Sequence, residues 1–307
     1  METKKASKTN WKHITVCVII LVIFVVTIGI NINAENITDE TIADSSSDII
    51  PLKANERIPL VNTENEVELA GPKEEVTVKI SEIDRYITTY KEELEFFSKC
   101  FKVNYEDIES DLIRIYEETN ELVFTNPGHL LDSKGNVKTY ETPERGIVEY
   151  FYSYVENNPK KVNNKRVAYK GGAEYVENLI IYYTTKVYTN VDTNTALSIG
   201  AAESGYYKVK YMLSVNNIFG GMSSNGLTKY KNIEYGVLSY VRMLSTGYYD
   251  KGLTSLESIG RKYCPTTDNN GNKVASSHWI SLVKTAMKKY GKYNYDINIE
   301  DLTVENA

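Results

Sequence analysis

One stretch of this sequence joins a close-packing helix surface to a carboxylate: it reads Ala196-Leu197-Ser198-Ile199-Gly200-Ala201-Ala202-Glu203-Ser204-Gly205. Small and apolar residues at positions 196, 199, 200 and 202 predict a helix that packs closely inside a core. Because burial disfavours a charged carboxylate, we expect the pKa of Glu203 to rise and the group to stay protonated near neutral pH. A protonated carboxyl group is what a general acid needs in order to donate to a glycosidic oxygen.

The segments that follow this helix give it a context. Thirteen residues after Glu203 the chain reads Asn216-Asn217-Ile218-Phe219-Gly220-Gly221-Met222. Next comes Ser223-Ser224-Asn225-Gly226, whose Asn-Gly pair is typical of a short hairpin. A further helix is expected from position 233, and a later one ends in Ile259-Gly260-Arg261-Lys262-Tyr263.

This succession resembles the glucosaminidase family of bacterial cell-wall hydrolases, glycoside hydrolase family 73, which belongs to the lysozyme and lytic transglycosylase superfamily. The resemblance covers about residues 143–290. It implies a mainly α chain with a lysozyme-like domain over residues 143–292. That domain is of the α+β type, because it adds a small β-hairpin to its helices. The resemblance also implies an endo-β-N-acetylglucosaminidase that cleaves the glycan strand of peptidoglycan, with Glu203 as the catalytic acid.

The resemblance assigns roles to several further residues. Tyr263 matches a catalytic tyrosine that reaches toward the acid or the reacting sugar. The positions that match substrate-binding residues of the family are Ser204, Asn217, Phe219, Gly220 and Tyr230.

The expected second carboxylate is the main departure from the family. Many members carry it on the hairpin, but residues 223–230 contain no acidic side chain. Glu234 stands just beyond and is a candidate, although its position favours a role at the start of the next helix. Ordinary retaining and inverting glycosidases need two carboxyl groups. With one, the substrate's own N-acetyl oxygen would assist, or a lytic transglycosylase would form an anhydro product.

Two alternatives follow from this departure. A lytic transglycosylase or muramidase of the same superfamily would cut at the other sugar of the repeat. A catalytically silent glycan-binding scaffold is the alternative from another class of protein: the missing hairpin carboxylate favours it, and the retained Glu203-Ser204 pair speaks against it.

The amino-terminal part of the chain predicts a membrane protein. Residues 14–32 contain no charged side chain and approach the roughly 20 residues that a membrane-spanning helix needs. Lysines precede this run and acidic residues follow it, so residues 1–13 form a cytoplasmic tail, residues 14–32 a transmembrane anchor, and the rest lies outside the cell. We therefore expect a single-pass protein of the cell membrane with an extracellular C-terminal domain. A cleaved signal peptide is the competing interpretation, against which the length of the run speaks.

The remaining segments differ in pattern. Residues 33–79 are acidic and proline-containing, which predicts a flexible tether. Apolar residues at three- and four-residue intervals in residues 80–126 predict a helical hairpin that packs on the main domain or docks a protein partner. Residues 293–307 are expected to be a C-terminal tail. The helices predicted in the main domain span residues 143–155, 173–188, 193–203, 233–244, 253–263 and 278–290.

Charge and composition limit the partners. The chain has 307 residues and a net charge of -6, which argues against a nucleic-acid-binding protein. That total is uneven: residues 34–100 hold 16 acidic and 7 basic side chains, whereas residues 203–292 hold 5 acidic and 13 basic ones. A basic C-terminal half outside the cell suits an anionic polymer such as peptidoglycan. The 25 tyrosines are expected in part to line the groove, through Tyr206, Tyr207, Tyr211, Tyr230, Tyr235 and Tyr263.

Neither a metal nor a cofactor is expected. The histidines His13, His129 and His278 are scattered and form no metal-ligand spacing. Cys17 lies in the membrane run, which leaves Cys100 and Cys264 either as free thiols or as one bridge.

Overall fold

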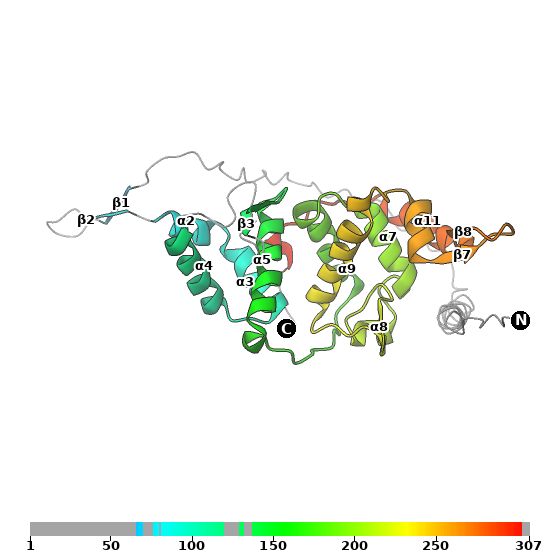
Figure 1. Ribbon diagram of the computed structural model, residues 1–307, viewed down its shortest axis with the longest axis horizontal. Helices are drawn as coiled ribbons and strands as arrows, with labels where there is room; N and C mark the ends of the chain where they lie inside the picture. Colours follow the sequence, from blue (N-terminus) through cyan, green and yellow to red (C-terminus); the bar gives the residue numbers. More distant parts are fainter. Residues whose placement is uncertain (1–65, 70–75, 80, 120–128, 132–136, 303–307) are drawn as a thin grey trace, which may run out of the picture. The chain divides into compact units, whose positions relative to one another are not determined.

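The computed structural model describes residues 66–69, 76–79, 81–119, 129–131 and 137–302 (Figure 1). Of the described part, 63% is helical and 5% is strand, so the fold is mainly α, as the sequence predicts. All of these elements belong to one unit that spans Glu64–Ala307. None of the helices in these ranges has the length and apolar character to cross a bilayer. The predicted anchor at residues 14–32 and the tail at residues 1–13 lie outside the described residues.

Each predicted helix of the main domain overlaps an observed one. The α-helices in the described ranges are α2 (Glu82–Thr89), α3 (Lys91–Phe101), α4 (Tyr105–Thr119), α5 (Pro143–Asn157), α6 (Ala173–Tyr182), α7 (Thr193–Ser204), α8 (Lys210–Ser214), α9 (Ile233–Gly247), α10 (Leu256–Tyr263) and α11 (Ser277–Tyr290). Shorter turns are η1 (Pro159–Lys161), η2 (Tyr183–Val187), η3 (Tyr249–Lys251) and η4 (Ile299–Leu302). Of these, α8 and the division of the predicted helix at residues 173–188 into α6 and a π-helical turn, η2, were not expected.

Side-chain caps determine where the main helices begin. The Thr142 hydroxyl accepts the amide of Arg145 in front of Pro143, and the Asp192 carboxylate accepts the amide of Thr195 at 2.7 Å. An N-cap of this kind satisfies an amide that the helix itself leaves unpaired. The predicted helix starts at residues 143 and 193 agree with the structure for this local reason.

The strands form four antiparallel hairpins in the described ranges: β1 (Glu66–Leu69) with β2 (Val76–Lys79), β3 (His129–Leu131) with β4 (Val137–Thr139), β5 (Met222–Ser223) with β6 (Gly226–Leu227), and β7 (Pro265–Thr267) with β8 (Lys273–Ala275). The pair β5–β6 is the predicted hairpin, with Ser223 opposite Gly226. The pair β1–β2 falls within residues 33–79, where we expected a tether without strands. The pair β7–β8 was also not expected; its turn is held by the Asp268 carboxylate, which accepts the amides of Asn270 and Asn272.

Helix α7 lies at the centre of the C-terminal half, between α9 and α11 in Figure 1. Its side chains from Ala196 to Ala201 are buried. Two tyrosine hydroxyls donate to its carbonyls: Tyr240 of α9 to Ala196 at 2.7 Å, and Tyr207 to Leu197 at 2.6 Å. A buried tyrosine needs such a partner for its hydroxyl. The close packing predicted from the small residues of this helix is thus observed.

The helices at residues 82–119 share a core with the later helices. Phe101 of α3 stacks on Phe151 of α5 at 5.2 Å between ring centroids, and Lys231 donates to the Phe101 carbonyl at 2.6 Å. The apolar face that we considered for a protein partner is therefore covered by the chain's own domain. The first helix of the predicted hairpin is divided at Tyr90, which ends α2 and precedes α3.

The segment after α11 is packed too. Tyr295 donates to the Tyr290 carbonyl at 2.7 Å, and Ile299 and Leu302 are buried. Residues 293–302 thus belong to the domain, and the expectation of a tail from residue 293 is wrong up to residue 302. The burial of the apolar side chains of Ile299 and Leu302 stabilises this segment on the domain.

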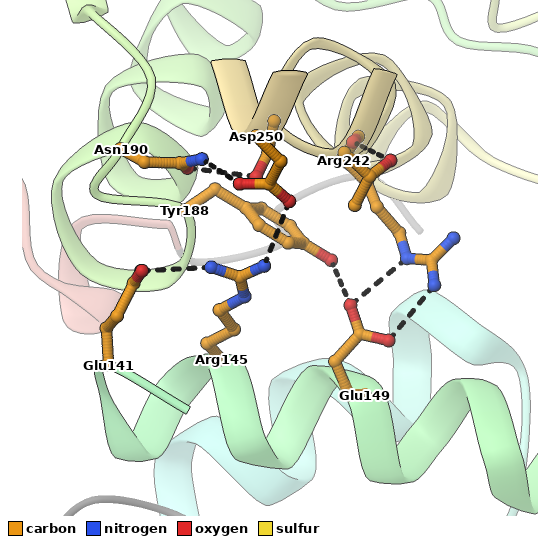
Figure 2. Close-up of polar contacts among 9 residues, drawn as sticks. Glu141, Arg145, Glu149, Tyr188, Asn190, Arg242 and Asp250 are labelled. Atoms are coloured by element: carbon orange, nitrogen blue, oxygen red, sulfur yellow. Dashed lines mark hydrogen bonds and ion pairs between the residues drawn. The ribbon is translucent and has the colours of Figure 1, made fainter. Parts of the chain in front are cut away.

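A polar network joins α5 to α9 (Figure 2). The Arg242 guanidinium donates to both oxygens of Glu149, at 3.1 and 3.0 Å, and the Tyr188 hydroxyl donates to the same carboxylate at 3.0 Å. Beside it, Arg145 contacts Glu141 and Asp250. A bidentate contact of this kind fixes the orientation of the two side chains and also pairs their charges, so the carboxylate of Glu149 has a structural role.

Most of the fully buried large side chains are tyrosines, whereas the sequence was expected to place part of its tyrosines in the groove. The fully buried ones are Tyr182, Tyr183, Tyr188, Tyr207, Tyr240 and Tyr290. Of the six proposed for the groove, Tyr207 lies in the core and Tyr211 is 66% exposed. The tyrosine excess is thus largely a property of the core, where rings fill volume and hydroxyls satisfy carbonyls.

The close packing of α9 at Gly236 against the backbone of Asn216 can be tested by substitution. A Cβ atom built at Gly236 would lie 1.9 Å from the backbone oxygen of Asn216, whereas one at Gly247, in the same helix, meets nothing within 4 Å. Gly236→Ala should lower the free energy of unfolding by about 2–4 kcal/mol because a backbone must move. Gly247→Ala should be neutral or stabilise by up to about 1 kcal/mol. Urea denaturation of both variants checks this, and equal effects would contradict the packing described.

Candidate active site

Glu203 lies in the last turn of α7 and is half-buried. The chain leaves the helix through Gly205, which adopts φ +59 and closes the helix by donating to the Ala201 carbonyl. Two more residues, Tyr206 and Tyr207, also have positive φ. This turn ends α7 close to Glu203, and the Glu203 carboxylate therefore lies at the edge of the core.

Burial governs the protonation of Glu203. Desolvation raises the pKa of its carboxyl group from 4.5 to about 7, and a hydrogen bond from Trp279 acts in the opposite direction. The Trp279 indole N–H donates to Oε1 at 2.9 Å. The carboxyl group is thus present in both forms near neutral pH, as a group that must donate and then accept a proton requires.

The second oxygen of Glu203 faces a glycine. Gly220 has φ +71, and a Cβ atom built on it would lie 3.3 Å from Oε2. Any other residue would be strained by this φ and would crowd the carboxyl group. One oxygen is thus held by an indole, and the other lies close to the Gly220 backbone.

Tyr263 lies beside this pair but does not bond to the acid. Its ring stacks on Trp279 at 5.5 Å between centroids, and its hydroxyl donates to the Phe219 carbonyl at 2.5 Å. The pKa of Tyr263 is raised well above its usual value, mainly by burial and also by the nearby Glu203 carboxylate. In the described conformation Tyr263 therefore holds the loop that carries Gly220, whereas we expected it to point at the acid or the sugar.

Two residues expected to bind substrate are instead fully buried. The Ser204 hydroxyl donates to the Gly200 carbonyl at 2.6 Å and accepts the Tyr207 amide. The Asn217 amide donates to the carbonyls of Gly221 and Thr228, both at 2.9 Å. Their polar groups shape the turn and the loop, so the expectation of direct substrate contact is not met by the structure.

Phe219 and Tyr230 form an aromatic layer beneath the same loop. The Phe219 ring is only 7% exposed and lies between Tyr240 and Tyr230, at 5.1 and 5.9 Å between centroids. Phe219 is therefore a core residue and not a surface for sugar. Tyr230 is half-buried and reaches an open pocket of about 610 Å³.

Glu234 belongs to a different environment from Glu203. It lies in the first turn of α9, accepts the Tyr175 hydroxyl at 3.0 Å, and lines a small pocket of about 110 Å³ with Cys100 and Lys102. Burial raises its pKa. Among the described residues, the Glu203 carboxyl group bonds to Trp279 and that of Glu234 bonds to Tyr175, so the two carboxyl groups share no hydrogen-bond partner.

Trp279 and Tyr240 lie at the site but were not predicted from the sequence. Trp279 lies 76 positions from Glu203, and Tyr240 reaches the carboxyl region from α9. The only signal for Trp279 was its place on the apolar face of α11, with Val283, Ala286 and Tyr290. That signal predicts burial but not the partner of the indole N–H.

The described residues contain no group of three or more His, Cys, Asp or Glu side chains that could hold a metal ion. Cys100 and Cys264 are not joined by a disulfide, so the bridge left open by the sequence is not formed.

Comparisons with protein families, characterised proteins and solved structures found no match to this chain. The resemblance to the glucosaminidase family therefore stays a prediction that rests on the residues themselves.

The indole of Trp279 should report the ionisation of Glu203. The chain contains two tryptophans, so Trp11→Phe leaves Trp279 as the single indole, which can be excited at wavelengths where the tyrosines do not absorb. Its emission should titrate with a midpoint near 7 as the bonded carboxyl group ionises. Adding Glu203→Gln should abolish the transition. A midpoint near the ordinary glutamate value would contradict the burial argument.

The raised pKa also predicts a pH-dependent stability. In the unfolded chain the carboxyl group ionises near 4.5, but in the folded chain only near 7. Folded protein therefore binds the proton more tightly, and stability is lost as the pH rises between these values. Glu203→Gln removes this loss, so relative to wild type it should gain about 1–3 kcal/mol between about pH 4.5 and about pH 8. Urea denaturation at both pH values measures this gain, with the exposed Glu156→Gln as the control; an equal gain in both variants would contradict the assignment.

Proposed function

We propose that this protein is a membrane-anchored, outward-facing peptidoglycan glycosidase with Glu203 as its general acid. The observation that carries the proposal is the carboxyl group of Glu203: its pKa of about 7, its one oxygen bonded to Trp279 and its other oxygen opposite Gly220. A glycosidic oxygen is a poor leaving group and must be protonated as the bond breaks. An acid half-ionised near neutral pH suits that step.

The hairpin carries no acidic side chain at residues 223–230, and this favours a one-carboxylate mechanism. Glu203 donates its proton to the leaving oxygen while the N-acetyl carbonyl oxygen of the substrate attacks C1 and closes a ring. Glu203, now ionised, then removes a proton from water, whose oxygen attacks C1 and opens that ring. Both steps balance, and Glu203 ends protonated as it began.

Cleavage after N-acetylglucosamine is the preferred reaction, by resemblance to the glucosaminidases. A muramidase or lytic transglycosylase would use the same acid at the bond after N-acetylmuramic acid. In the lytic reaction the ionised Glu203 would take the proton of the C6 hydroxyl, and that oxygen would close an anhydro ring at C1.

The location and partners follow from the sequence. The apolar residues 14–32 would anchor the chain in the cell membrane, and the basic C-terminal half would face the cell wall. Peptidoglycan glycan strands are the proposed partner, and no cofactor is invoked.

The decisive test uses Glu203→Gln in the full-length chain. Wild type should release soluble muropeptides from purified peptidoglycan, and the variant should lose about 10²-fold or more of this rate, since a neutral amide cannot donate the proton. Glu234→Gln is the matched control and should retain activity, because Glu234 lies in a separate environment. Retained activity of Glu203→Gln would exclude the mechanism.

Mass spectrometry of the products identifies the bond. A reducing N-acetylglucosamine end supports the preferred reaction, whereas a reducing or 1,6-anhydro muramic acid end supports the alternatives. Binding to peptidoglycan without any release would support the silent scaffold.

A further inference from the structure

A basic pocket lies next to the loop that faces Glu203. It has a volume of about 610 Å³, and its lining residues are Asn164, Arg166, Lys229, Tyr230, Lys231 and Tyr235. Three of the six are cationic, two are aromatic, and none is acidic. Glu203 does not line this pocket, so it is separate from the position of the acid.

Arg166 is held in place although it lies in neither helix nor strand. The residue before it, Lys165, accepts the Lys102 ammonium through its carbonyl. The residue after it, Val167, donates its amide to the Lys231 carbonyl at 2.9 Å and accepts the Asn216 amide at 2.8 Å. Both neighbours of Arg166 are thus held by hydrogen bonds, which fixes the backbone from which the Arg166 side chain lines the pocket.

The positive charge of the pocket is not compensated. Within the described ranges, no carboxylate lies at ion-pair distance from Arg166, Lys229 or Lys231. Burial lowers the pKa of Lys231 to about 8, and the ammonium of Lys102 acts in the same direction. The Lys231 ammonium lies 4.2 Å from the centroid of the Tyr235 ring. The ring face attracts the cation but does not neutralise its charge.

One side chain connects the pocket to the candidate active site. Tyr230 lines the pocket and also packs against Phe219, the residue before Gly220. The Asn216 amide donates to the Tyr230 carbonyl at 2.9 Å, and the Tyr230 amide donates to the Val215 carbonyl. Hydrogen bonds and ring packing thus join the pocket to the loop opposite Glu203.

We propose that this pocket binds a carboxylate of the peptide stem on the glycan strand whose bond faces Glu203, an inference that rests on the proposed function. Arg166 presents two parallel N–H donors, which match the two oxygens of a carboxylate. Lys229 adds a second charge, and the tyrosine rings offer apolar contact to the stem. The connection through Tyr230 favours a group on the substrate strand itself over a phosphate of a separate wall polymer.

The test measures binding without turnover, in the full-length Glu203→Gln chain. Its partners are peptidoglycan freed of phosphate polymers, the same material with its carboxylates converted to amides by a carbodiimide and ammonia, and isolated teichoic acid. Adding Arg166→Ala and Lys229→Ala should weaken cosedimentation with the first material by about tenfold. Amidation should weaken the parent chain similarly, and the two losses should not add.

The matched control removes the same charge elsewhere. Lys251→Ala with Lys288→Ala deletes two exposed ammonium groups that do not line the pocket. Thermal unfolding of all variants should be unchanged, because the side chains of Arg166 and Lys229 are exposed and their neighbours are held through backbone groups.

Three results would overturn the inference: equal losses in the pocket and control variants, binding that is insensitive to amidation, or a pocket-dependent loss only with teichoic acid. Its failure is distinguishable from failure of the proposed function. If the wild-type chain binds through the pocket but releases no muropeptides, the enzyme proposal is excluded and the pocket proposal stands. If the wild-type chain releases muropeptides but the pocket and control variants lose equal amounts of binding, the pocket proposal is excluded and the enzyme proposal stands.

Discussion

The end of helix α7 imposes the condition on which the rest of the site depends. Three consecutive residues, Gly205, Tyr206 and Tyr207, have positive φ, and only the first is a glycine. A non-glycine residue in this region costs about 1–2 kcal/mol. The cost is offset because the Tyr207 ring is buried, its hydroxyl donates to Leu197 and its amide donates to the Ser204 hydroxyl. The turn thereby ends α7 where Glu203 lies at the boundary of the core.

That boundary explains the chemistry of Glu203. Deeper burial without a donor would leave the carboxyl group permanently neutral, and full exposure would leave it permanently charged. The indole of Trp279 bonds to the anion while the surrounding apolar atoms oppose it, and the balance lies near neutral pH. Because Trp279 also stacks on Tyr263, which bonds to the Phe219 carbonyl, one chain of contacts positions both the acid and the loop opposite it.

Polar residues near the site are used mainly to shape the backbone. Asn216 and Asn217 are both fully buried, and their amides bind carbonyls on three segments of the chain. A loop without regular structure has many backbone groups to satisfy, and buried asparagines satisfy them. The groups left free to meet a ligand are instead exposed cations and half-buried tyrosines around the loop.

Local patterns predicted much of this molecule. The starts of α5 and α7, the β5–β6 hairpin, the mainly α class and the place of Glu203 at a helix end depend on residues a few positions apart. Interactions of this range are present in the linear sequence and can be found there.

Only the tertiary structure decided which side chains meet. Trp279 reaches Glu203 across 76 positions, Ser204 and Asn217 point inward, and residues 293–302 pack on the domain. Each of these outcomes depends on how distant helices come together, and the same serine or asparagine can face a ligand or a carbonyl depending on that packing. The sequence by itself therefore determined the helix and its acid, and the packing of distant elements determined the protonation and the surroundings of that acid.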